Sequence, residues 1–247
     1  MMRKNLPPPE DETLDSFFHG RIKVRQKKAG YRFSVDAPLL ASAVETRPGD
    51  ELCELGAGCG IVSLLLSLKP FGHITALEVQ EPLADLAERN VRLNGLQDRI
   101  TVVRADLRKF RPRRRFDVVF SNPPYIRKRQ GFLSASTEKS VAKHEIKCDI
   151  LDVMRAASGL LRETGRAYFI FPVRRREDFE RAAAASGLTL TSLRLVHPRK
   201  DAPANLFLSR CEPRAVPLET RPPLILFKDC GTYTDEARRI FAGRFDG

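Results

Sequence analysis

Residues 51–60 read ELCELGAGCG, a short run of mixed residues that leads into Gly56, Gly58 and Gly60. Glycines at alternate positions allow a sharp turn and let backbone N–H groups approach a ligand closely. Residues 61–68, IVSLLLSL, follow with the composition of a buried helix. The segment therefore predicts a strand, a ligand-binding glycine loop and a helix, which is the opening unit of an α/β fold.

The spacing of the glycines excludes a nicotinamide-type dinucleotide site. The fingerprint G-x-G-x-x-G would need a third glycine at position 61, where Ile61 stands. Glu54 precedes the loop instead. A carboxylate there suits a ligand whose tail carries an ammonium group and no phosphate, and it would repel a pyrophosphate.

After the loop, apolar runs alternate with helical patterns. Strands are expected at 73–78, 100–104, 116–121 and 166–172, and helices at 82–94, 149–161 and 177–186. The last part of the chain adds two strand-rich segments without a helix between them (188–196 and 205–211), a strand at 224–227 and a helix at 235–241. This order predicts a Rossmann-like α/β fold with a seven-stranded, mostly parallel sheet that ends in an antiparallel hairpin.

The chain before the glycine loop divides in two. Residues 1–16 are charged and proline-rich and are expected to form a flexible leader, so that one domain covers 17–247. Within it, residues 17–48 form an N-terminal segment with a small strand at 17–24 and a helix capped by Asp36.

Composition narrows the class of partner. Lys and Arg number 43 against 31 Asp and Glu, and the net charge of +12 favours a polyanionic partner such as nucleic acid over a merely solvated basic surface. The five cysteines include no Cys-x-x-Cys pair, which argues for reduced thiols in a cytoplasmic protein and against a metal site. No apolar stretch is long enough to cross a membrane.

Two further carboxylates stand at strand ends. Glu78 ends the strand expected at 73–78, and Asp106 follows the strand expected at 100–104. At such positions Glu78 can accept both hydroxyls of a ribose, and Asp106 can accept from an adenine amino group. Taken singly, each has the alternative of a surface carboxylate or a helix cap.

The tetrapeptide NPPY at the end of the fourth strand comprises Asn122, Pro123, Pro124 and Tyr125. An amine conjugated to a ring is a weak nucleophile because its lone pair is delocalised. The Asn122 carboxamide oxygen and the Pro123 carbonyl can each accept one N–H of that amine and turn its lone pair toward a methyl donor, while Tyr125 offers a stacking face. The alternative is a turn that only terminates the strand.

These motifs resemble the class I methyltransferases that use S-adenosylmethionine (AdoMet) and methylate amines, whose hallmark is [DNS]-P-P-[YFW]. A narrower resemblance is to bacterial tRNA-Val adenine-N6 methyltransferases. It rests on the segments GYRFSVDAPLLA at 30–41, ALEVQ at 76–80, ERNVRLNGLQDRI at 88–100, AKHE at 142–145 and YTDEA at 233–237. Glu54 departs mildly from the pattern, because many relatives have Asp there, and the leader has no recognised counterpart.

The resemblance implies a role for particular residues. AdoMet would be bound by Tyr31, Phe33, Ser34, Asp36, Glu54, Gly56, Gly58, Gly60, Glu78, Val79, Asp106 and Asn122, with 17–48 covering the cofactor. Asn122, Pro123, Pro124 and Tyr125 would form the catalytic site that holds the target base. RNA phosphates would be contacted by Arg127, Lys128, Arg129, Lys143, His144, Arg174 and Arg175, although a solvated face is the alternative for each basic run.

The leading functional hypothesis is therefore adenine-N6 methylation in a tRNA anticodon loop by a cytoplasmic monomer or weak dimer. Within the same chemistry the alternatives are a protein glutamine-N5 methyltransferase and an rRNA guanine-N2 methyltransferase. An alternative of another class is a non-catalytic RNA-binding module that retains the fold.

Overall fold

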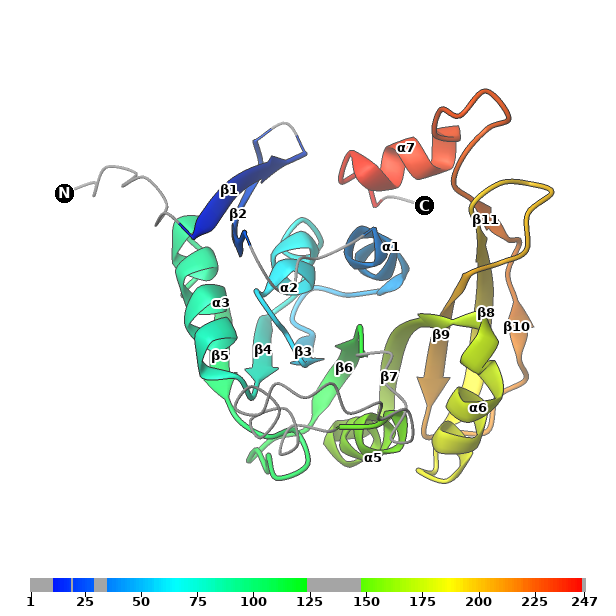
Figure 1. The fold of residues 1–247 in the computed structure, drawn as a ribbon. Coiled ribbons are helices and arrows are strands. Elements are labelled where there is room, and N and C mark those ends of the chain that lie inside the picture. Colours follow the sequence, from blue (N-terminus) through cyan, green and yellow to red (C-terminus); the bar gives the residue numbers. More distant parts are fainter. Residues whose placement is uncertain (1–10, 19, 29–34, 124–147, 246–247) are drawn as a thin grey trace, which may run out of the picture.

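A computed structural model describes residues 11–18, 20–28, 35–123 and 148–245 (Figure 1). Its centre is a sheet whose parallel strands are β3 (Glu51–Leu55), β4 (His73–Glu78), β5 (Ile100–Arg104), β6 (Phe116–Ser121) and β7 (Leu161–Pro172). β8 (Thr189–His197) and β9 (Leu206–Glu212) follow, and β9 is antiparallel to both β7 and β8.

The strand order is β10-β8-β9-β7-β6-β3-β4-β5, with β11 also paired to β8. The predicted parallel sheet with an antiparallel hairpin is confirmed. β11 (Leu224–Ile225) lies within the strand expected at 224–227, whereas the two-residue strand β10 (Glu219–Thr220) was not expected, and both extend the β8 edge. A pairing as short as that of β10 carries too little sequence pattern to be recognised from the sequence.

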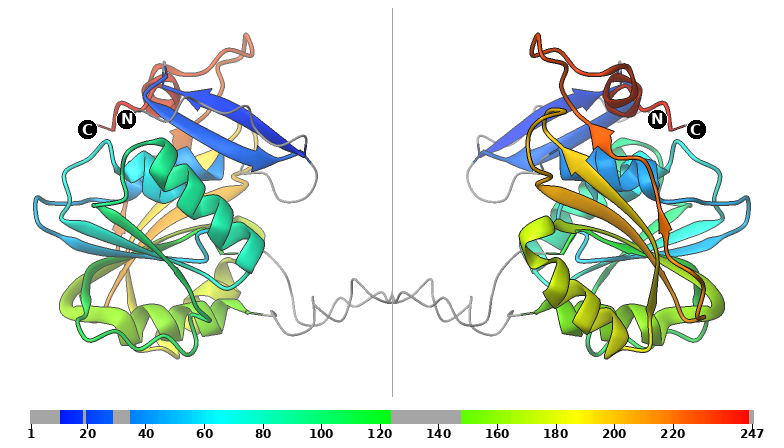
Figure 2. Two further views of the ribbon diagram at one scale, coloured as in Figure 1. Left: turned by 90° about the vertical axis from the view of Figure 1, so that its left-hand side faces the viewer. Right: turned by 90° about the vertical axis from the view of Figure 1, so that its right-hand side faces the viewer.

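Helices cover both faces of the sheet, as Figures 1 and 2 show. α1 (Asp36–Ala43), α2 (Ile61–Leu66), α3 (Glu81–Leu93) and α7 (Asp235–Phe241) share a core with one face, and α5 (Ile150–Leu160) and α6 (Arg176–Ala184) share a core with the other. The inner strands are buried on both sides, which explains why they read as continuous apolar runs. In the part of the chain that is described, no helix is long and apolar enough to cross a membrane.

The N-terminal segment differs from the prediction. Instead of one strand at 17–24, the chain forms an antiparallel hairpin of β1 (Glu12–Phe17) and β2 (Ile22–Lys27), so residues 12–16 belong to the fold and not to a leader. Arg89 on α3 donates two hydrogen bonds to the buried carboxylate of Glu12, at 2.9 and 2.8 Å. β1 is thus held by partners that are distant in sequence. Its own residues are too polar for their sequence pattern to predict a strand.

Two helix starts illustrate different local causes. Asp36 was expected to cap α1, but it is the first helical residue, and Val35 occupies the N-cap without a side-chain hydrogen bond. The prediction of a cap at Asp36 is therefore wrong. By contrast, Asp149 and Asp152 form a reciprocal capping box at the start of α5, which satisfies two otherwise unpaired N–H groups.

Candidate active site

The glycine loop lies between β3 and α2 and has the backbone that its sequence predicts. Gly56, Gly58 and Gly60 have φ angles of +74°, +57° and +81°, in the left-handed region that favours glycine. The N–H groups of Gly56 and Ala57 both donate to the carbonyl of Leu77, at 2.9 and 2.8 Å. The loop is therefore fastened to the end of the neighbouring strand β4.

Glu54 lies near the end of β3 and is almost completely buried, with 2% of its surface exposed. Its carboxylate accepts a hydrogen bond from the Ser63 backbone N–H at 3.2 Å and another from the Ser63 hydroxyl. Burial raises the pKa of Glu54 to about 8, against the opposing effect of these hydrogen bonds. A cation beside this carboxylate would favour its ionised form.

Glu78, the last residue of β4, is fixed on both sides. Its Oε2 accepts from the Gly58 N–H at 2.8 Å, and its Oε1 accepts from the Gln80 N–H at 2.9 Å. The next side chain, Val79, is 38% exposed and presents apolar surface at the same strand end. Glu78 therefore links the glycine loop to the start of α3 and holds a carboxylate beside both.

Asp106 follows β5 and is held by Arg108, a contact that the sequence analysis did not identify. The Arg108 guanidinium donates to both carboxylate oxygens, the shortest distance being 2.6 Å, and the Arg108 N–H donates to Oδ1 at 2.9 Å. The same contacts lower the pKa of Asp106. Arg108 thus orients the Asp106 carboxylate, which was predicted to accept a hydrogen bond from adenine. The short spacing between the two residues is the sequence feature that could have indicated their contact.

The first half of NPPY lies at the end of β6. Ser121, which precedes it, is buried and donates from its hydroxyl to the Leu55 carbonyl at 2.7 Å, which ties the end of β6 to the end of β3. Asn122 is partly buried and Pro123 is buried. Pro124 and Tyr125 lie outside the described residues, as do the predicted cofactor contacts Tyr31, Phe33 and Ser34.

The arrangement of strands brings the predicted residues to one edge of the sheet. β6, β3, β4 and β5 are successive neighbours and all run in the same direction. Asn122, Glu54, Glu78 and Asp106 therefore follow one another along the carboxyl edge, where ligands bind in open α/β sheets. Asp36, at the start of α1, is the part of the predicted covering segment that is described.

The residues predicted to contact RNA differ in their surroundings. Arg174 is exposed after β7, whereas Arg175 is 7% exposed, donates to Asp178 at 3.2 Å and lies over the Phe171 ring at 5.1 Å from its centre. Arg175 is buried and bonded within the protein, so we do not propose it as an RNA contact. Arg127, Lys128, Arg129, Lys143 and His144 lie outside the described residues.

Comparison with known proteins identifies the family. Residues 32–168 match the methyltransferase small domain family. The chain belongs to this family. A tRNA1(Val) (adenine(37)-N6)-methyltransferase of Dyadobacter fermentans is 28% identical over 88% of this chain and 92% of its own length. The Vibrio cholerae protein of the same name is 29% identical over 83% of this chain and 86% of its own.

Solved structures share the fold. A predicted O-methyltransferase from Agrobacterium tumefaciens superposes with a TM-score of 0.67 at 24% identity, covering 85% of this chain and 96% of its own. TYW2 of P. horikoshii in complex with MeSAdo gives a TM-score of 0.58 at 15% identity, covering 83% of this chain and 73% of its own. The fold is thus that of class I methyltransferases.

The protein is an AdoMet-dependent methyltransferase, and the described residues fit that cofactor. A Cβ placed on Gly56 would meet no atom within 4 Å, so the loop borders open space. Glu54 offers a buried carboxylate for an ammonium group, and Glu78 offers one for ribose hydroxyls. Among the described residues no three His, Cys, Asp or Glu side chains group so as to hold a metal ion.

Proposed function

We propose that this enzyme transfers a methyl group from AdoMet to N6 of an adenine in the anticodon loop of a tRNA of the tRNA1(Val) type. The observation that carries the proposal is the position of Asn122 and Pro123 at the end of β6, directly beside the β3 glycine loop. The names of relatives that match most of the chain support the choice of acceptor.

The chain's own contribution is to orient the acceptor amine. The carboxamide oxygen of Asn122 and the carbonyl of Pro123 each accept one N–H of the adenine amino group, which directs the nitrogen lone pair out of the plane of the ring. Bound AdoMet supplies an electrophilic methyl group. The methylated nitrogen then releases one proton, so that the amine keeps a single N–H; its acidity while positively charged makes a dedicated strong base unnecessary.

Electrostatics supports an RNA substrate. The net charge of +12 attracts a polyanion, and the exposed Arg174 follows β7 at the same carboxyl edge as the site. An adenine in a loop can reach the partly buried Asn122 at the end of β6 after it is turned out of its stack. A cytoplasmic location belongs to the same proposal.

The test is to supply labelled AdoMet together with total bacterial tRNA, rRNA or a protein extract, and to digest each product to nucleosides or amino acids. N6-methyladenosine from the tRNA fraction supports the proposal. Label in guanine-N2 of rRNA or in glutamine-N5 of a protein would assign the acceptor to one of the alternatives. AdoMet binding without transfer to any fraction would favour a non-catalytic RNA-binding module.

A further inference from the structure

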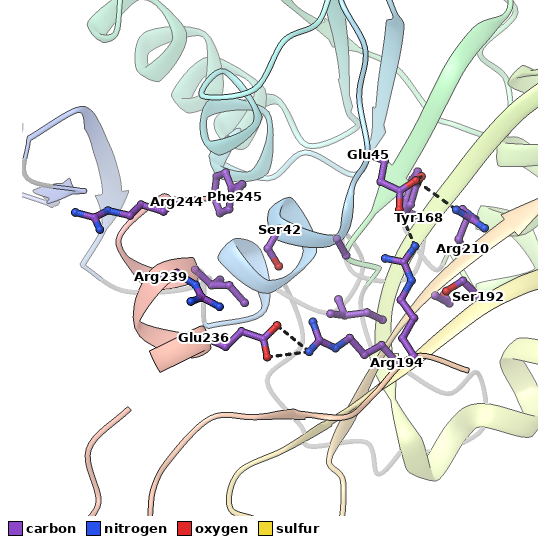
Figure 3. A pocket seen from close by; sticks show the side chains of 15 residues that line it. Ser42, Glu45, Tyr168, Ser192, Arg194, Arg210, Glu236, Arg239, Arg244 and Phe245 are labelled. Atoms are coloured by element: carbon purple, nitrogen blue, oxygen red, sulfur yellow. Dashed lines mark hydrogen bonds and ion pairs between the residues drawn. The ribbon is translucent and has the colours of Figure 1, made fainter. Parts of the chain in front are cut away.

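A second polar site lies away from the glycine loop, in a cavity of about 200 Å³ that is bordered by α1, α7 and the strands β7, β8 and β9 (Figure 3). Its strand residues come from the antiparallel side of the sheet, whereas the candidate active site uses β3, β4, β5 and β6. The described lining contains more cationic than anionic side chains: Arg194, Arg210, Arg221, Arg239 and Arg244 against Glu45 and Glu236.

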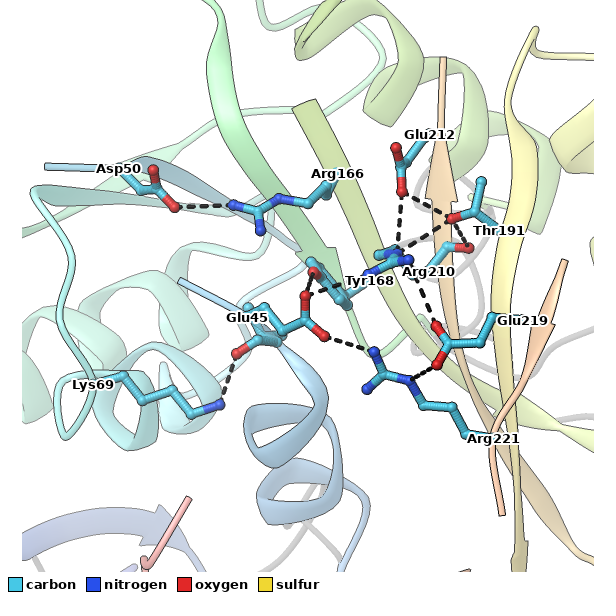
Figure 4. A network of polar contacts seen from close by, with 11 residues as sticks. Glu45, Asp50, Lys69, Arg166, Tyr168, Thr191, Arg210, Glu212, Glu219 and Arg221 are labelled. Atoms are coloured by element: carbon cyan, nitrogen blue, oxygen red, sulfur yellow. Dashed lines mark hydrogen bonds and ion pairs between the residues drawn. The ribbon is translucent and has the colours of Figure 1, made fainter. Parts of the chain in front are cut away.

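The inner arginines of the cavity are held in place by carboxylates. Glu45 accepts from Arg221 at 2.8 Å and from Arg210 at 3.3 Å, and Glu219 pairs with Arg221 at 3.4 Å (Figure 4). Burial alone would raise the pKa of Glu45, but the hydrogen bond from Arg221 and the nearby charges lower it. Arg194 is held in the same way by Glu236 at 2.8 Å. These guanidinium groups are therefore preorganised, and their charge is largely compensated.

The outer arginines of the cavity are different. Arg239 on α7 and Arg244 just after it are exposed, and neither forms an ion pair within 4.0 Å with a carboxylate of the described residues, although Arg239 is close enough to help lower the pKa of Asp235. The neighbouring Arg238 does not line the cavity and pairs with Asp235 at 3.6 Å. The two cavity-lining arginines at this end of the chain thus lack the ion pair that Arg238 has.

A polar side chain also points into this space without a partner. Ser192 on β8 is 5% exposed, lines the cavity, and its hydroxyl makes no hydrogen bond with the described residues. The pairing of β8 with β9 shifts its register between Leu190 and Ser192, and such bulges re-aim side chains. The Ser192 oxygen is not among the fully buried atoms that lack a partner, so it is reachable from the cavity and can donate to a ligand that accepts hydrogen bonds.

We propose that this cavity binds a backbone phosphate of the RNA substrate, which would be a second anchoring point for the RNA besides the adenine pocket. The inference rests on the proposed function. A phosphate group presents several acceptor oxygens and a negative charge, which match the guanidinium groups of Arg239 and Arg244 and the Ser192 hydroxyl. RNA is favoured over a small anion because Arg239 and Arg244 are exposed, so that an extended chain can reach them.

The experiment compares tRNA binding by the full-length wild type with that of Arg239→Gln/Arg244→Gln and Ser192→Ala. The matched control is Arg238→Gln/Arg92→Gln, which removes the same charge from exposed arginines that are paired with Asp235 and Glu88 and do not line the cavity. Binding is measured between about 50 and about 200 mM salt, since each lost phosphate contact reduces the slope of log affinity against log salt by about 0.7 to 0.9.

The expected result is a slope lower by about one phosphate contact in the double arginine variant and weaker binding by Ser192→Ala, with the control's slope unchanged. AdoMet affinity and thermal unfolding should match the wild type in every variant. Equal slopes in the test and control variants would overturn the proposal. So would a stabilisation by inorganic phosphate that depends on Ser192 while tRNA binding does not, because the cavity would then bind a free anion.

This result can be separated from a failure of the proposed function. If the wild type transfers no methyl group to tRNA and does not bind it, both proposals are contradicted. If the wild type methylates tRNA and the cavity variants bind it with unaltered slope, only the phosphate site is contradicted. A raised KM for tRNA with unchanged kcat is expected of the cavity variants, because they act on binding and not on the reacting atoms.

Discussion

Replacing Glu54 with glutamine should make the cofactor-free protein more resistant to unfolding at high pH. The substitution keeps the size of the side chain and an oxygen that can accept from Ser63, but it removes a charge that is buried between β3 and α2. The wild-type carboxyl has a pKa of about 8 against an ordinary value of 4.5. The folded protein therefore keeps a proton that the unfolded chain has already lost.

The sign and size of the effect follow from that shift. Below the unfolded value both states carry the proton, and the stabilising contribution of the protonated carboxyl is fully present. As the pH rises toward the folded value, this contribution is lost at about 1.4 kcal/mol per pH unit. Over the window from 4.5 to about 8, the wild type should lose up to about 5 kcal/mol of unfolding free energy relative to Glu54→Gln.

The assay is urea unfolding of both proteins without cofactor at about pH 5 and about pH 8.5, which lie near the ends of the titration window. The difference in unfolding free energy should move in favour of glutamine as the pH rises. Ser63→Ala removes a hydrogen bond that stabilises the carboxylate and should enlarge the shift. A difference between Glu54→Gln and wild type that does not change with pH would refute the argument that burial governs this carboxyl.

Further predictions concern the loop, the hairpin and the thiols. Gly60→Ala should cost about 1–3 kcal/mol of unfolding free energy and weaken AdoMet binding, because φ is +81° there; thermal unfolding and calorimetry check this, and a neutral substitution would contradict it. Arg89→Ala should lower the free energy of unfolding in urea by about 1–3 kcal/mol, because it leaves the Glu12 carboxylate buried with fewer partners. A loss no larger than that of a typical exposed ion pair would show that the contact between Arg89 and the hairpin is unimportant. Iodoacetamide should modify Cys230 well before Cys59, because a hydrogen bond with Thr232 lowers the pKa of Cys230 and burial raises the pKa of Cys59 to about 12. Peptide mass spectrometry measures the order of modification, and the reverse order would contradict this prediction.

The parts of the fold that could be predicted from the sequence are those with local causes. The strand at Glu51–Leu55 and the strand at His73–Glu78 occur where the apolar runs predict them. The glycine loop was predictable because three glycines with left-handed backbone at alternate positions leave a sequence pattern that few other structures need. Once the strands are known to be parallel, their common direction predicts that the site residues meet at the carboxyl edge of the sheet.

What the sequence did not reveal depends on distant contacts. β1 is held by a side chain on α3, and its own residues look like a polar leader. Arg175 was expected to contact RNA because it belongs to a basic run that follows a strand at the edge of the site, yet Asp178 and Phe171 engage it. The cavity between α1 and α7 collects residues from five separate elements, so no local pattern announces it.

The role of Asn122 in orienting the acceptor amine is tested by single-turnover methyl transfer to tRNA by wild type, Asn122→Ala and Asn205→Ala, with AdoMet affinity measured in parallel. Asn205 is exposed, and its side chain makes no hydrogen bond with the described residues, so it serves as the control. We expect N6-methyladenosine from the wild type and from Asn205→Ala, and none from Asn122→Ala although that variant still binds AdoMet. Wild-type turnover by Asn122→Ala would contradict the claim that the end of β6 orients the acceptor amine.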